Sequence, residues 1–198
     1  MTNGLITSSR HLAKVVFLDR DGVINQDSPD YIKSWSEFHF LPGSIEAVKR
    51  LTMNGFFVFL ITNQSAVSRG MISQKDLEYI HSRMMQEIEK GGGHIKDIFY
   101  CPHLPEDECE CRKPEAGLIY MAQKAYKLDL SSAVMVGDSS KDVECALNAG
   151  CGKTVLVRTG NGNKAEESLG EKNIRPDFIA NDLYHAVNWI IPHYTDII

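Results

Sequence analysis

Short apolar runs alternate along this chain with longer stretches of helical periodicity, and this alternation constrains the fold more than any other feature. The runs are rich in β-branched and aromatic residues, which favour strands, whereas the longer stretches repeat their apolar residues every three or four positions. The predicted strands are 15–19, 56–62, 95–100, 133–137, 154–157 and 177–180, and the predicted helices are 44–53, 73–90, 115–127, 140–148 and 182–191. Strands that alternate with helices form a parallel sheet covered on both faces. We therefore expect an α/β, Rossmann-like fold.

Length and charge narrow the class of protein. With 198 residues, 43% of them hydrophobic, the chain can bury one large core, so we expect residues 1–198 to form a single domain. The formal net charge of -5 gives no support for binding to nucleic acid or to an anionic membrane. No signal peptide is visible and no apolar run approaches the roughly 20 residues that span a bilayer. We expect a cytoplasmic monomer with no membrane contact.

Chemically active residues follow the ends of the predicted strands. In open parallel sheets the active site lies beyond the carboxyl ends of the strands. The residues at those ends are Asp19 at the end of the first strand and Asp21 after it, Thr62 in the second, Cys101 and His103 after the third, and Asp138 after the fourth. One shared site is therefore expected.

Three of these residues are carboxylates, namely Asp19, Asp21 and Asp138. Carboxylates that converge are unfavourable unless a cation neutralises them. Oxygen ligands suit a hard ion, and magnesium is the usual partner of phosphate chemistry. The pattern predicts a magnesium site, although Asp19-Arg20-Asp21 taken alone also fits a solvated turn with helix-capping carboxylates.

Four segments, in order, resemble the motifs of the haloacid dehalogenase (HAD) superfamily. They are Phe17 to Val23, Leu60 to Asn63, Lys113, and Val136 to Asp142. The resemblance implies a phosphatase in which Asp19 is the nucleophile and Asp21 the general acid and base. It further implies that Thr62 and Lys113 hold the phosphoryl group, that Asp19, Asp138 and the backbone carbonyl of Asp21 bind magnesium, and that Asp142 orients Lys113 or metal-bound water.

A cluster of cysteine and histidine lies between the second and third motifs. Cys101, His103, Cys109 and Cys111 supply three sulfurs and one imidazole, a set that suits tetrahedral zinc. The alternatives are buried thiols or an adventitious disulfide. Because all four ligands come from the protein, we expect a structural metal in a loop at about 101–111. Such a metal would fix the direction of Arg112 and of Lys113.

The spacing of the motifs and the loop sequences narrow the range of expected substrates. Only about forty residues separate Asp21 from Thr62, and the cysteine loop occupies the other position where HAD enzymes carry a cap, so we expect an essentially capless protein. The Cys-Pro-His and Cys-x-Cys-Arg-Lys-Pro segments resemble two groups, the D-glycero-D-manno-heptose 1,7-bisphosphate 7-phosphatases of lipopolysaccharide precursor synthesis and the histidinol-phosphate phosphatases. Thr62 to Ser65 and Val155 to Gly160 are more similar to the heptose group.

The heptose resemblance implies a sugar bisphosphate as substrate. The implied contacts are Asp27, Asp30, Asn63, Gln64, Ser65 and Arg112, the last as a clamp for the second phosphate. Histidinol phosphate is the alternative substrate, and a phosphorylated nucleic-acid end is a third, which the acidic charge disfavours. A zinc-stabilised binding module without activity would leave the catalytic set unexplained.

Overall fold

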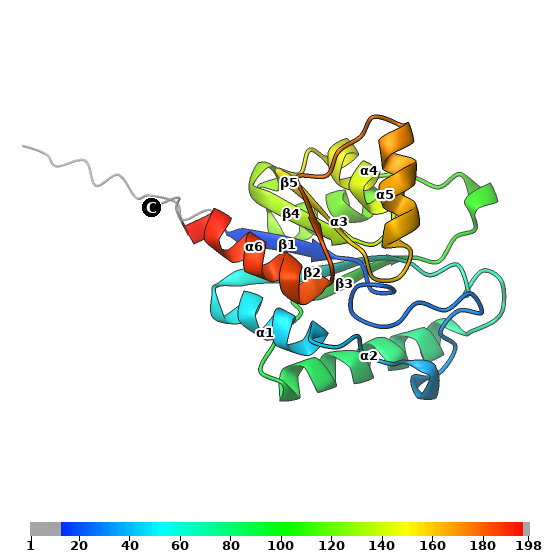
Figure 1. The fold of residues 1–198 in the computed structure, drawn as a ribbon. Coiled ribbons are helices and arrows are strands. Elements are labelled where there is room, and N and C mark those ends of the chain that lie inside the picture. Colours follow the sequence, from blue (N-terminus) through cyan, green and yellow to red (C-terminus); the bar gives the residue numbers. More distant parts are fainter. Residues whose placement is uncertain (1–12, 196–198) are drawn as a thin grey trace, which may run out of the picture.

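A computed structural model describes residues 13–195 and contains a six-stranded sheet whose neighbouring strands are all parallel. The strand order is β3-β2-β1-β4-β5-β6 (Figure 1). The strands are β1 (Lys14–Leu18), β2 (Phe56–Asn63), β3 (Asp97–Cys101), β4 (Ala133–Gly137), β5 (Lys153–Val157) and β6 (Phe178–Ala180). The predicted α/β fold is confirmed.

Helices cover both faces of the sheet (Figure 1). One face carries α1 (Ser44–Met53), α2 (Gln74–Lys90) and α6 (Leu183–Thr195), and the other carries α3 (Gly117–Tyr126), α4 (Ser140–Ala149) and α5 (Gly162–Glu171). Short 3-10 turns lie at Trp35–Glu37, Pro105–Asp107 and Leu130–Ser132.

The central strand β1 has no alternation of polar and apolar residues because both of its faces are buried. Val16 and Leu18 pack in the core shared with α1, α2 and α6, whereas Val15 and Phe17 pack in the core shared with α3 and α4. All four side chains are fully buried, and burying each contributes about 1.5–3 kcal/mol. This strand is therefore a rigid support for the residues at its carboxyl end.

Some boundaries and one helix differ from the sequence prediction. Strand β3 begins at Asp97 rather than at residue 95, and α3 begins at Gly117 rather than at residue 115. Ser73, the first residue of the predicted helix 73–90, is the N-cap of α2, since its side chain accepts a hydrogen bond from the amide of Asp76. Helix α5 was not predicted because most of its residues are polar, and it packs on the sheet mainly through Ala165 and Leu169.

The edge of the sheet at the strand ends carries loops and no separate folded unit. Between β1 and β2 the chain forms a loop, a 3-10 turn and α1, and after β3 it forms the loop 102–116. Within residues 13–195 neither insertion builds a second sheet, in agreement with the capless expectation. None of the helices in the described part of the chain is long and apolar enough to cross a membrane.

Candidate active site

Of the residues expected to share one site at the strand ends, Asp19, Asp21, Thr62 and Asp138 line one pocket, whereas Cys101 and His103 do not. Leu18 of β1 pairs with Leu60 of β2 and with Val136 of β4, and the amide of Asp19 donates to the Val136 carbonyl at 3.0 Å. A pocket of about 270 Å³ opens there. Of the residues singled out in the sequence, it is lined by Asp19, Asp21, Asp27, Thr62, Asn63, Gln64, Ser65, Arg112, Lys113, Asp138 and Asp142.

Asp19, Asp138 and Asp142 form a buried carboxylate cluster in the floor of this pocket. One oxygen from each carboxylate lies within 4.8 Å of the others. Burial and, among the neighbouring carboxylates, chiefly Asp142 raise the pKa of Asp19 to about 7 and that of Asp138 to about 8. A cluster of this kind holds more negative charge than its protein surroundings neutralise, and its all-oxygen donor set fits a hard divalent cation such as magnesium.

Lys113 is the cation that the protein itself supplies to the cluster. Its ammonium Nζ lies 2.9 Å from Asp19 Oδ1 and 2.5 Å from Asp142 Oδ1, and it donates to the Ile61 carbonyl at 2.8 Å. Burial alone would lower the pKa of Lys113, but the Asp142 and Asp19 carboxylates outweigh it and raise the pKa. Lys113 therefore stays charged, and Asp142, which also accepts from the Ser139 amide at 3.0 Å, fixes its direction.

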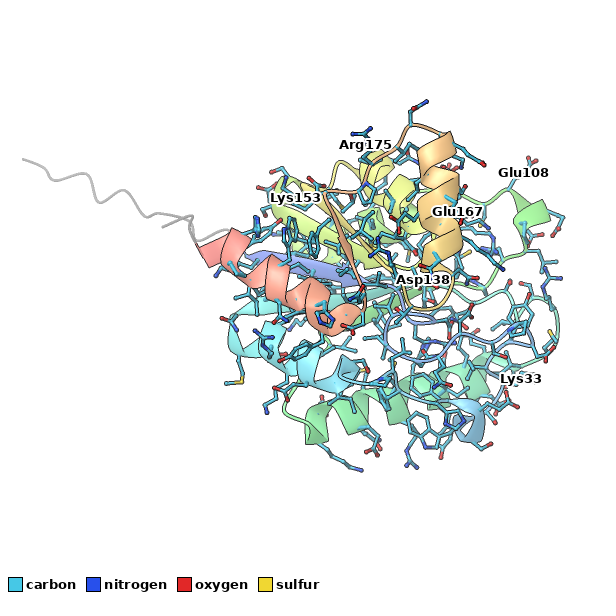
Figure 2. All side chains as sticks on the ribbon, in the orientation of Figure 1. Lys33, Glu108, Asp138, Lys153, Glu167 and Arg175 are labelled. Carbon is cyan, nitrogen blue, oxygen red and sulfur yellow. The ribbon has the colours of Figure 1, made fainter. Side chains whose placement is uncertain are left out.

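Asp138 is held by a loop that approaches it closely. The amide of Asn161 donates to Asp138 Oδ2 at 2.7 Å, and the Thr159 hydroxyl donates to the Gly22 carbonyl at 2.6 Å. At Gly22 and at Gly160 the φ angles are positive, and a Cβ at either position would lie 2.1 Å from Asp138 Oδ2. Only glycine allows both backbones to come this near. In Figure 2 Asp138 lies beside the start of α5, at the end of the sheet.

Asp21 lies outside the carboxylate cluster and has its own cation. The Arg20 guanidinium holds both of its oxygens, with Nη2 at 2.9 Å from each, and the side-chain amides of Asn25 and Gln64 each donate at 2.8 Å. Burial would raise the pKa of Asp21, but Arg20 and the two amides together lower it. The two aspartates of the first motif therefore have opposite electrostatic surroundings.

The residues at the end of β2 are engaged with protein groups. The Asn63 side chain donates to the Lys113 carbonyl and accepts from the Lys113 amide, both at 3.1 Å. Gln64 donates to the Thr62 hydroxyl at 3.0 Å as well as to Asp21. Ser65 is buried and lines the pocket. Through these contacts the side chains of Asn63 and Gln64 position Lys113 and Asp21.

The predicted sugar contacts are divided between two hollows. Asp27 lines the pocket and accepts from the Asn161 side chain at 2.7 Å. Asp30 is exposed and lines only an adjoining hollow with Lys33, to which Asp27 also contributes. The sequence could not show this because the course of the loop after β1 has no period. Arg112 lines the pocket and donates to the His103 carbonyl at 3.0 Å.

The cysteine and histidine residues come together as a second cluster. One ligand atom from each of Cys101, His103, Cys109 and Cys111 lies within 4.8 Å of the others. His103 Nδ1 lies 3.2 Å from Cys111 Sγ, and Cys101 Sγ lies 3.5 Å from Cys109 Sγ. Donors this close fit one tetrahedral metal ion. The loop that carries them extends away from the sheet, with Glu108 at its outer part (Figure 2).

Several residues of the pocket were not singled out from the sequence, among them Arg20, Lys141 and Asn161. Lys141 and Asn161 lie at its rim, and Arg20 lies beneath Asp21. A signal existed for Arg20, since a charged residue directly after a fully buried strand needs a partner. Lys141 lies in the first turn of α4 and Asn161 is the N-cap residue of α5, positions that many solvated polar residues share.

The chain is similar in sequence to proteins of one phosphatase family. Residues 110–186 match the family model described as HAD-hydrolase-like. The D-glycero-beta-D-manno-heptose-1,7-bisphosphate 7-phosphatase of Pseudomonas aeruginosa is 45% identical over 169 residues, which are 85% of this chain and 93% of that protein. The enzyme of the same name from Bordetella bronchiseptica is 45% identical over 151 residues, 76% of this chain and 84% of its own.

Solved structures of phosphatases from this family have the same fold as this chain. A D,D-heptose 1,7-bisphosphate phosphatase from B. bronchiseptica, complexed with magnesium and phosphate, superposes with a TM-score of 0.85 at 39% identity, and the match covers 91% of this chain and 99% of that one. A phosphatase of the same name from Burkholderia thailandensis gives a TM-score of 0.68 at 30% identity, over 90% and 98% of the two chains.

Proposed function

The chain belongs to the D,D-heptose 1,7-bisphosphate 7-phosphatase family of HAD hydrolases, and from this premise we propose that it removes the 7-phosphate of D-glycero-D-manno-heptose 1,7-bisphosphate. Two observations together support the proposal. The chain is highly identical to these phosphatases over most of its length, and one pocket contains a buried carboxylate cluster, its lysine and a separate aspartate.

In the proposed reaction the phosphoryl group is transferred in two successive displacements, first to Asp19 and then to water. A carboxylate oxygen of Asp19 attacks phosphorus, the bond from phosphorus to the sugar oxygen breaks, and Asp21 gives that oxygen a proton. Asp21 then takes a proton from water as the water oxygen attacks phosphorus and releases phosphate from Asp19. Lys113 and the Thr62 hydroxyl hold the phosphoryl oxygens and balance their charge.

Asp19 and Asp138 are the side chains that would hold magnesium, with the Asp21 carbonyl as a further ligand. The ion supplies charge neutralisation for the phosphoryl oxygens. The excess negative charge of the carboxylate cluster supports this assignment, as does the magnesium in the similar B. bronchiseptica structure.

The metal in the second cluster is zinc in this proposal, and its role is structural. Three thiolates and one imidazole leave no position for substrate on a tetrahedral ion. The Arg112 guanidinium bonds to the carbonyl of His103, one of the ligands, and Lys113 follows Arg112 directly. Binding of zinc would thereby hold both cations at the pocket.

The substrate is tested by phosphate release from three compounds: the heptose bisphosphate, histidinol phosphate and a phosphorylated oligonucleotide. We expect the highest kcat/KM with the bisphosphate and a product that keeps its phosphate on carbon 1. Equal or better hydrolysis of histidinol phosphate would instead assign the chain to that reaction. Cleavage of the oligonucleotide alone would contradict both.

A further inference from the structure

The residue behind Arg20 lies on a different element, 61 positions along the chain. Arg20 Nη1 lies 3.1 Å from Nε2 of His81, which belongs to α2. Arginine has no acceptor atom, so Arg20 donates and the imidazole nitrogen accepts. Arg20 and His81 are only 1% and 5% exposed, and an arginine buried this deeply needs partners for its charge and its donors.

The two partners of Arg20 hold opposite ends of one planar group. Nε and Nη2 point to the Asp21 carboxylate, while Nη1 points to His81. Because the guanidinium is rigid and planar, fixing Nη1 also fixes the direction of the two donors on Asp21. His81 is itself held against the Tyr100 ring, with centroids 5.7 Å apart and planes at 65°.

His81 is suited to accept this hydrogen bond at every working pH. Burial, and then the nearby charge of Arg20, lower the pKa of His81 to about 3. The imidazole is therefore neutral, and the nitrogen facing Arg20 keeps its lone pair. A protonated ring there would have no acceptor to offer and would repel the guanidinium.

We propose that His81 is a positioning residue, which acts through Arg20 to aim the Asp21 carboxylate at the leaving oxygen of the substrate. The inference rests on the proposed function in one respect, the role of Asp21 as the acid. It predicts a particular kind of defect. Loss of the His81 acceptor should slow the departure of poor leaving groups and spare good ones, because only poor leaving groups need a proton.

Two artificial substrates test this without reference to any sugar. Phenyl phosphate has a basic leaving group, whereas p-nitrophenyl phosphate has one that departs as a stable anion. The ratio kcat/KM reports only the steps up to departure of the leaving group. Since a positioned acid contributes about 10²–10⁴-fold, we expect His81→Leu to lower kcat/KM for phenyl phosphate about tenfold or more and to leave that for p-nitrophenyl phosphate within about twofold.

Four further variants make the result decisive. His81→Gln keeps an acceptor oxygen and should restore most of the phenyl phosphate activity, while Asp21→Asn should show the same selective loss more strongly. Met84→Ala, a fully buried change on the same helix, controls for lost stability and should lower Tm without selectivity. His81→Met fills the space without a comparable acceptor and replaces His81→Leu if that variant does not fold.

The two proposals fail in different ways. Equal losses on both aryl phosphates, or no loss on either, would overturn the role of His81. An enzyme that leaves the heptose bisphosphate intact but shows the selective defect would overturn the substrate and retain the role of His81.

Discussion

Gly160→Ala tests whether close approach of the backbone fixes the Asp138 carboxylate. Gly160 has a φ of +56, where an alanine costs about 1–2 kcal/mol. Its Cβ would also lie 2.1 Å from Asp138 Oδ2 and 2.8 Å from the Gly22 Cα, so the carboxylate must move. That movement breaks the bond from the Asn161 amide, a charge-assisted contact of about 1.5–3 kcal/mol. We therefore expect a loss of about 2.5–5 kcal/mol of stability or of magnesium binding.

The assay is the dependence of kcat on magnesium concentration, together with Tm. Disturbed contacts around a metal ligand cost about 10–100-fold in metal affinity, and we expect the half-saturating magnesium concentration of Gly160→Ala to rise by that factor. Gly150→Ala is the control for backbone strain, since Gly150 has a φ of +76 and nothing within 4 Å.

Gly150→Ala should lose about 1–2 kcal/mol, or about 2–8 °C in Tm, with unchanged magnesium dependence. Gly170→Ala lies within α5, has open space around it and should be neutral or stabilising. If Gly160→Ala and Gly150→Ala have the same magnesium dependence, the reasoning about close approach is refuted.

Four other changes have defined outcomes. Asp19→Asn should abolish turnover with an unchanged Tm, and substantial activity in the purified variant would rule out Asp19 as the nucleophile. Metal analysis should find about one zinc per chain, and its removal, or Cys109→Ser, should lower Tm and activity together; protein purified without chelators that contains no zinc contradicts the site. Arg112→Ala should reduce kcat/KM for the bisphosphate about tenfold to a hundredfold and affect phenyl phosphate little. Hydrogen bonds from Lys153 and Thr154 outweigh burial and lower the pKa of Asp177. These bonds therefore stabilise the folded protein above the unfolded pKa of Asp177, and this stabilisation is lost in acid. The Tm difference between wild type and Asp177→Asn should shrink as the pH falls from 7 to 3.

Sequence reasoning succeeded where local pattern and topology determine the outcome. The strands were predictable because buried runs such as Val15 to Leu18 have one structural solution in an alternating chain. Their parallel order brings Asp19 and Asp138 to one edge, so the carboxylate cluster follows from the positions of the residues relative to the strand ends. The cysteine cluster needed only residue types and short spacing.

The remaining features depend on how distant elements pack. The apolar period of α2 places His81 on its buried face, but the local sequence does not specify that Arg20 is the residue it meets there. The course of residues 24–43 decides that Asp27 reaches the pocket and Asp30 does not. Helix α5 was not predicted because only two of its side chains are buried against the sheet, too few to produce an apolar period in the sequence.

The first motif shows what residue types alone cannot predict about a site. Asp19 and Asp21 are two positions apart and chemically identical, yet burial among carboxylates raises the pKa of Asp19 to about 7, while Arg20, Asn25 and Gln64 together lower that of Asp21. A cation held at the cluster favours the ionised form of Asp19, which is the form that attacks phosphorus. The negative charge of an arriving phosphate acts on Asp21 in the opposite sense and favours its protonated form. Two aspartates with unlike partners can therefore exchange electrostatic roles when metal and substrate bind, and for Asp21 the charge of the arriving phosphate must outweigh Arg20, which favours the ionised form.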